Sequence, residues 1–197
     1  GQSCIAWEDE PADKQQIMCS RSFGRPVTEL VDLQQAVAVF VTRAGAKLRA
    51  QHSYTDAVQV FIRTSPFRDG PKHAGSTVVR LERTDDTAAL IRAVSKGLRS
   101  IFRPGYPYAK AGVCLLDIST SLVAHAQMEL FGSERPTPRQ HRGELMGVID
   151  RLNERYGRAT VMAAGALSNG TAPWQMRQER MTPAYTTDWD QVVEIWR

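Results

Sequence analysis

Hydrophobic and polar positions follow two periods along residues 1–120, and together they predict six elements. Residues 58–65 alternate as in a half-buried strand, with Val58, Val60 and Ile62 on one face and Gln59, Phe61 and Arg63 on the other, and 16–23, 77–82 and 108–117 are further short strand-like segments. Two longer segments repeat apolar residues at helical spacing. Their stripes are Leu33, Val37, Phe40, Val41, Ala44 and Leu48, followed by Leu90, Ile91, Val94, Leu98, Ile101 and Phe102.

The order of these elements predicts the fold class. It is α+β, a β-α-β-β-α-β unit with a four-stranded antiparallel sheet and two helices on one face, so the other face is expected to be open. Thr84 is the expected N-cap of the second helix, with Asp85 and Asp86 in its first turn. We expect a bulge near Ser20, because strict alternation would place Arg21 in an apolar row of the first strand.

The chain is expected to have four parts. A helix over 139–156 and a small apolar strand over 160–167 are expected near the C-terminus, and they are too few to form a core alone. This unit is therefore expected to dock on the main domain or on a partner. The expected parts are a tether over 1–14, the sheet domain over 15–122, a Gly- and Pro-rich connector over 123–138 and a small α/β extension over 139–197.

Charge narrows the class of partner. The chain has 197 residues and a net charge of +4, and 20 of its 25 basic residues are arginine. Arginine binds phosphates and stacks on bases, which favours nucleic acid over a membrane surface, although genome-driven arginine usage explains the composition equally well. No apolar run is long enough for a membrane span. The three cysteines form no CxxC pair, which predicts reduced thiols, and the absence of a starting Met predicts an excised fragment.

The open face of the sheet is the candidate binding surface. If Ala109, Ala111, Val113 and Leu115 face the helices, the outward residues carry cations, hydroxyls and aromatic rings, which suits contact with a sugar-phosphate backbone. The alternative is that they are ordinary solvated strand residues. The outward set expected from this alternation is Gln59, Phe61, Arg63, Ser65, Arg80, Tyr108 and Lys110.

Catalysis and metal binding have little support in the sequence. Metal-dependent nucleotidyl transfer needs converging carboxylates, and capping of a helix already explains Asp85 and Asp86. The four histidines are scattered, and no Gly-rich phosphate loop is present. We therefore expect a chain that is not an enzyme by itself and holds no metal. Phosphate binding without catalysis is expected at Ser20, Arg21, Ser22 and Gly24, where hydroxyls, a cation and an accessible backbone amide come together.

The pentapeptide Gln127-Met128-Glu129-Leu130-Phe131 places two adjacent hydrophobic residues in the predicted connector. Because a connector offers them no core, Leu130 and Phe131 are expected to fill a pocket on another protein. Met128 would supply a flexible apolar stem beside them.

Three segments carry a resemblance to a known family. Residues 19–24 (CSRSFG), 61–67 (FIRTSPF) and 108–113 (YAKAGV) resemble the UmuC family of Y-family translesion DNA polymerases, and the similarity covers essentially the whole chain. The resemblance implies that the sheet domain is the little finger, or polymerase-associated, domain and that residues 174–189 belong to a family-specific C-terminal extension. It also implies that the catalytic carboxylates, Mg²⁺ and dNTPs belong to the parent polymerase.

The resemblance further implies residue roles. Ser20, Arg21, Ser22 and Gly24 match a motif that holds template or primer phosphates, and Arg63, Thr64, Arg80 and Lys110 lie on strands expected in the DNA major groove. Residues Gln127, Met128, Leu130 and Phe131 match the peptide by which bacterial polymerases bind the sliding clamp. The implied setting is damage tolerance in the SOS response, in the bacterial cytoplasm and at the nucleoid.

Two alternatives stay open. In the first alternative, the chain is a protein-interaction module that docks UmuD-like accessory subunits or a RecA filament, and its DNA contact is incidental. The Trp- and Met-rich tail favours this reading, because such residues anchor interfaces. The second is an RNA-binding domain of similar topology, which is disfavoured because the central strands lack a pair of aromatic residues for base stacking.

Overall fold

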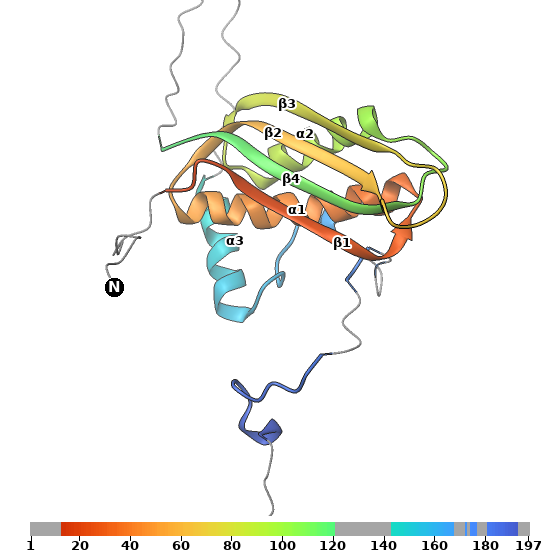
Figure 1. Ribbon diagram of the computed structural model, residues 1–197. Helices are drawn as coiled ribbons and strands as arrows, with labels where there is room; N and C mark the ends of the chain where they lie inside the picture. Colours follow the sequence, from red (N-terminus) through yellow and green to blue (C-terminus); the bar gives the residue numbers. More distant parts are fainter. Residues whose placement is uncertain (1–12, 121–142, 168–171, 173, 177–180, 193–197) are drawn as a thin grey trace, which may run out of the picture.

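The computed structural model contains the six elements of the expected unit in the expected order. It describes residues 13–120, 143–167, 172, 174–176 and 181–192. The four strands form one antiparallel sheet in the order β1-β4-β2-β3, and α1 and α2 lie side by side on one face of it (Figure 1). The elements are β1 Ile17–Val27, α1 Leu30–Ala50, β2 Tyr54–Thr64, β3 Ala74–Thr84, α2 Thr87–Ile101 and β4 Tyr108–Ser119. The predicted fold class is confirmed.

The core lies between the sheet and the two helices. Val58, Val60 and Ile62 of β2 are buried against the helices, whereas the residues between them along the strand face the other way. The apolar stripe of α1 is buried along its length, from Leu33 to Leu48. Asp86, not Thr84, caps α2, because its carboxylate accepts a hydrogen bond from the Ala88 amide at 2.8 Å. The helix therefore starts two residues later than predicted.

The strand pairing corrects two predictions, one on β4 and one on β1. On β4, Lys110 pairs with Arg63 and Tyr108 pairs with Thr64, so Ala109 is an extra residue that bulges. Such a bulge reverses the side on which the preceding side chain lies. Tyr108 is therefore fully buried in the core, and its expected place on the open face is wrong. On β1 the pairing is regular from Ile17 to Ser22, and the register shifts only after that, so no bulge occurs near Ser20.

The buried Tyr108 hydroxyl joins β4 to neighbouring loops. It accepts a hydrogen bond from the Arg103 amide at 3.0 Å, and it lies 2.9 Å from Nδ1 of His73. Burial raises the pKa of this phenol, so the hydroxyl stays protonated and able to donate. Tyr108 is thus a structural residue of the domain.

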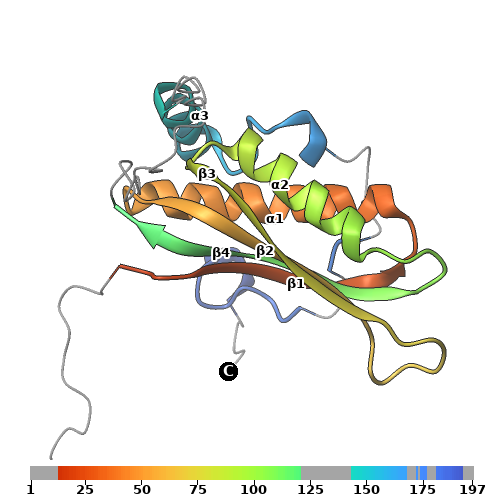
Figure 2. The same ribbon diagram turned by 90° about the horizontal axis from the view of Figure 1, so that it is seen from above.

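The C-terminal extension docks on the helical layer. Helix α3 (Gly143–Tyr156) follows the undescribed residues 121–142, and the short 3-10 helix η1 (Ala164–Ala166) packs against α1 (Figure 2). Trp174 is buried, with its ring edge-on to Phe40 of α1 at 6.0 Å between centroids. The Gly24 amide of β1 donates to the Gln175 carbonyl at 3.0 Å. Of the two expected alternatives, the main domain or a partner, the described residues of the extension dock on the main domain.

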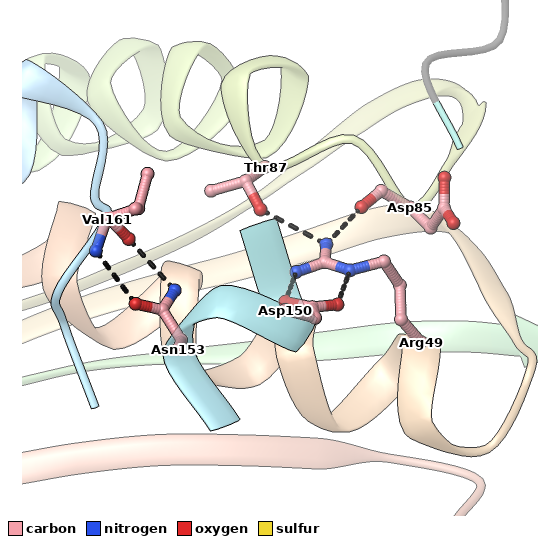
Figure 3. A network of polar contacts seen from close by, with 6 residues as sticks. All are labelled: Arg49, Asp85, Thr87, Asp150, Asn153 and Val161. Atoms are coloured by element: carbon pink, nitrogen blue, oxygen red, sulfur yellow. Dashed lines mark hydrogen bonds and ion pairs between the residues drawn. The ribbon is translucent and has the colours of Figure 1, made fainter. Parts of the chain in front are cut away.

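One arginine organises the contact between α3 and the domain. The guanidinium of Arg49 makes a two-pronged ion pair with Asp150 of α3, at 2.6 Å from Nε and 2.9 Å from Nη2 (Figure 3). Its Nη1 donates to the Asp85 carbonyl at 2.7 Å and to the Thr87 hydroxyl at 3.1 Å. Only 10% of the Arg49 side chain is exposed, so solvent screens this pair less than a surface pair.

The segment after α3 is not the strand that the sequence predicted. Residues 158–161 form a turn and bend, and η1 follows after two residues of irregular structure. Asn153 of α3 fixes this segment by donating to the Val161 carbonyl at 2.9 Å and accepting from the Val161 amide at 2.8 Å. The small residues of η1 allow close packing on α1, where Ala166 is buried. In the described part of the extension we find no strand.

A second 3-10 helix, η2 (Trp189–Gln191), lies in the described segment 181–192. Asp188 caps it by accepting from the Asp190 amide at 3.1 Å. None of the helices that the structure describes is long and apolar enough to cross a bilayer.

Candidate nucleic-acid interface

The sheet face opposite α1 and α2 carries the candidate interface. Of the described helices, α1, α2 and α3 lie on the other side of the sheet (Figure 2), and η2 lies away from the sheet, beyond β1 (Figure 1). The strand pairing aligns its side chains in rows that cross the sheet from β1 through β4 and β2 to β3. The rows are Ser22, Lys110, Arg63 and Ala74; then Ser20, Gly112, Phe61 and Ser76; then Met18, Cys114, Gln59 and Val78; and finally Leu116, Ala57 and Arg80.

The first row places two cations side by side. Arg63 and Lys110 are directly opposite each other on adjacent antiparallel strands. Cβ atoms of such neighbours lie about 4.5–5.5 Å apart, and like charges in that arrangement destabilise the sheet. Neither residue makes an ion pair in the part of the chain that the structure describes. An anion placed between them would relieve the repulsion, and the Ser22 hydroxyl lies next in the row as a donor.

The second row forms a flat surface beside these cations. A Cβ on Gly112 would lie 2.4 Å from the Phe61 ring and 2.5 Å from Cβ of Ser20, so only glycine lets the ring lie over β4. Ser20 and Ser76 flank the row with hydroxyl groups. Neither Gly112 nor Ser76 is among the site residues predicted from the sequence. A glycine within a strand often marks a close approach of this kind, and that signal could have identified Gly112.

The far end of the face has a different charge. Arg80 forms an exposed ion pair with Asp117 at 3.4 Å, and Glu82 is exposed on the same strand. An exposed ion pair of this kind contributes little to stability, so Arg80 can exchange Asp117 for another anion. Positive charge without an acidic partner is therefore concentrated at the end that leads into the β2–β3 loop.

Three of the predicted site residues do not belong to this surface. Arg21 pairs with Ala111, so it lies on the helical side of the sheet, exposed because β1 is an edge strand. Thr64 is buried, and its hydroxyl accepts from the His73 amide at 3.1 Å. The Gly24 amide, expected to approach a phosphate, is occupied by the Gln175 carbonyl.

The remaining predictions concern metals, thiols and the clamp motif. The described residues contain no cluster of three or more His, Cys, Asp or Glu side chains that could hold a metal. Cys19 and Cys114 are free thiols, and burial raises the pKa of Cys114. Residues 127–131, the predicted clamp motif, lie outside the described residues, as do residues 1–12 of the predicted tether.

Comparison with known proteins identifies the family to which this chain is similar. Residues 14–130 match the impB/mucB/samB family C-terminal domain, and residues 144–195 match a domain of unknown function, DUF4113. The chain is 41% identical to Protein ImpB of Salmonella typhimurium over 192 residues, which cover 96% of this chain and 43% of ImpB. It is 36% identical to Protein UmuC of Salmonella typhimurium strain LT2 over 197 residues, 99% of this chain and 45% of UmuC.

These matches cover nearly all of this chain but less than half of each relative. Among solved structures, the crystal structure of DinB from Sulfolobus solfataricus aligns with a TM-score of 0.40 at 10% identity, over 51% of this chain and 28% of DinB. The family match covers the whole sheet domain and more than half of the chain. The chain belongs to the impB/mucB/samB family, and it carries the C-terminal domain of that family followed by the DUF4113 extension.

Proposed function

We propose that this chain is the DNA- and clamp-binding C-terminal part of an error-prone Y-family translesion DNA polymerase of the UmuC kind. The cross-strand cation pair Arg63 and Lys110 is the observation that carries the DNA-binding part of the proposal. Two like charges side by side on an uncovered face cost stability, and a phosphate is the partner that would turn that cost into binding energy. Polymerisation, with its Mg²⁺ and dNTPs, is assigned to the rest of such a protein.

The proposed binding reads the backbone and not the base sequence. The open face offers cations and serine hydroxyls, groups that make most phosphate contacts in protein–DNA complexes, and phosphate contacts carry no sequence information directly. Gln59, the one amide in the face, lies two rows from the cation pair. A polymerase that tolerates damaged bases benefits from a grip that does not depend on them.

The clamp-binding part of the proposal rests on the sequence of residues 127–131. We expect the double variant Leu130→Ala with Phe131→Ala to weaken clamp binding by about a hundredfold or more, because each side chain contributes about 1.5–3 kcal/mol when buried. Surface plasmon resonance with the immobilised sliding clamp measures this change. DNA affinity of the same variant should stay unchanged. Clamp affinity equal to that of the parent chain would refute the assignment.

The alternative of a protein-docking module has one observation in its favour. The apolar residues Leu145 and Val148 of α3 are 50% and 43% exposed, while the polar Asp150 holds the helix to the domain through Arg49. This helix therefore presents an apolar side that the described residues do not cover. Pull-down with UmuD-like subunits or RecA, with and without DNA, separates this role from DNA binding.

A further inference from the structure

The loop between β2 and β3 presents the most exposed large hydrophobic side chain of the described residues. Phe67 is 96% exposed, and it lies between Pro66 and Arg68 at the tip of the hairpin. The loop projects beyond the helical layer at the end of the sheet where Arg63 and Lys110 lie (Figure 2). A fully exposed ring contributes nothing to the core. At this tip it is free to contact a partner that has a flat apolar face.

Hydrogen bonds give the loop a defined shape. The Lys72 ammonium donates to the Ser65 carbonyl at 2.9 Å and also to the Arg68 carbonyl, so its side chain bridges the loop. The Phe67 amide donates to the Ser65 hydroxyl at 3.3 Å. Gly70 turns the chain with φ of 113°, which favours glycine. A loop organised in this way has less conformational entropy to lose when it binds.

The base of the loop is anchored to the domain. The Thr64 amide donates to the His73 carbonyl at 2.9 Å, and the His73 ring contacts the buried Tyr108 hydroxyl. Next to this anchor lies a shallow, open hollow of about 410 Å³. Its lining combines cations with small apolar surfaces: Arg63, Thr64, Pro66, Lys72, His73 and Ala74.

The charge around the hollow is positive. Residues 63–73 contain three cations, Arg63, Arg68 and Lys72, and one acidic residue, Asp69. An ammonium has three donors, and two of those of Lys72 go to carbonyl groups, which leaves one for a ligand. Arg63 belongs both to this hollow and to the first row of the open face. The loop therefore continues the proposed DNA surface past the edge of the sheet.

We propose that the β2–β3 loop is a second DNA contact, selective for an unpaired nucleotide next to the duplex that the sheet holds. The base stacks on the Phe67 ring, and its phosphate lies between Arg63 and Lys72. Bases inside a duplex have both faces covered by their neighbours, so away from duplex ends a single exposed ring finds a free base face only where a nucleotide is unpaired. This inference rests on the proposed function and names a further ligand of the same surface.

The test compares two DNA substrates on the full chain. Fluorescence anisotropy gives the affinity for a blunt duplex and for the same duplex with a single-stranded overhang. We expect Phe67→Ala to weaken overhang binding by about 5- to 150-fold, because that is the range for loss of one aromatic–base stack, and to leave blunt-duplex binding unchanged. Phe67→Trp should retain overhang binding, and 2-aminopurine in the overhang should lose its quenching only with Phe67→Ala.

A matched control is Trp189→Ala, which removes another aromatic side chain that is 91% exposed and should change neither affinity. If Phe67→Ala lowered the affinity for both substrates equally, the proposed selectivity for unpaired nucleotides would be wrong. No loss on either substrate would overturn the loop as a DNA contact and leave protein binding as its remaining role. Failure of the proposed function itself looks different, because Arg63→Glu with Lys110→Glu would then change neither substrate.

Discussion

Replacing Arg63 and Lys110 together by glutamate is expected to weaken duplex DNA binding by roughly 60-fold or more at about 0.1 M salt. Each phosphate contact contributes about 0.9 to the slope of log affinity against log salt concentration, so two lost contacts lower that slope by about 1.8. The two residues occupy adjacent positions of one row, and we propose that they share the same stretch of backbone. The measurement is anisotropy of a labelled duplex at several salt concentrations.

A charge-matched control separates a local effect from a general one. Arg92 and Lys96 are exposed on α2, on the opposite face of the domain, and their replacement by glutamate changes the net charge by the same amount. This control should lose much less affinity and keep the parent slope. The fold of the test variant should also survive, since the double replacement exchanges one like-charged pair for another. Equal losses for the two variants would mean that net charge, and not the open face, governs binding.

Trp174→Ala is the second change with a large expected effect, here on stability. The Trp174 ring is 8% exposed and packs edge-on against Phe40 of α1. Loss of a buried tryptophan costs about 3–5 kcal/mol in the free energy of unfolding, from lost burial and from the cavity that remains. Urea denaturation of the full chain measures this change. Trp189→Ala, at a position that is 91% exposed, should change stability little.

Hydrogen exchange distinguishes undocking of the extension from a cavity in a docked one. The Gly24 amide donates to the Gln175 carbonyl, one residue after Trp174. If Trp174→Ala releases the extension, this amide should exchange faster than amides of the central pair β2 and β4. Stability unchanged by Trp174→Ala would contradict the view that the extension and the sheet domain share one core.

Local pattern predicted the sheet and its two helices because their periodicity records which side is buried. Val58, Val60 and Ile62 alternate with Gln59, Phe61 and Arg63, and the structure separates them onto two faces in that way. Tyr108 was misplaced because a single bulged residue, Ala109, reverses the alternation without any change in hydrophobicity. The segment 160–167 was predicted to be a strand from its apolar composition, but it packs on α1 as a turn and a 3-10 helix.

The candidate site was predictable only where one strand determines it. Arg63 and Lys110 follow from the strand pattern, but their position side by side comes from the register between β2 and β4. The hydrogen bond from the Gly24 amide to the Gln175 carbonyl joins residues about 150 positions apart in the sequence, and no local signal indicates it. The same holds for Arg49 and Asp150, which unite α1 and α3. Long-range pairing of this kind depends on the packing of the whole domain.

Chemical-shift mapping tests most directly the claim that the uncovered sheet face binds DNA. Backbone amide spectra of the full chain are recorded while a short duplex is added at moderate salt. We expect the largest shifts on the open face, at Phe61, Lys110 and Gly112, and small shifts at Gln34 and Ser95 on the helical side. Shifts concentrated on α1 and α2, with Phe61, Lys110 and Gly112 unchanged at saturation, would contradict it.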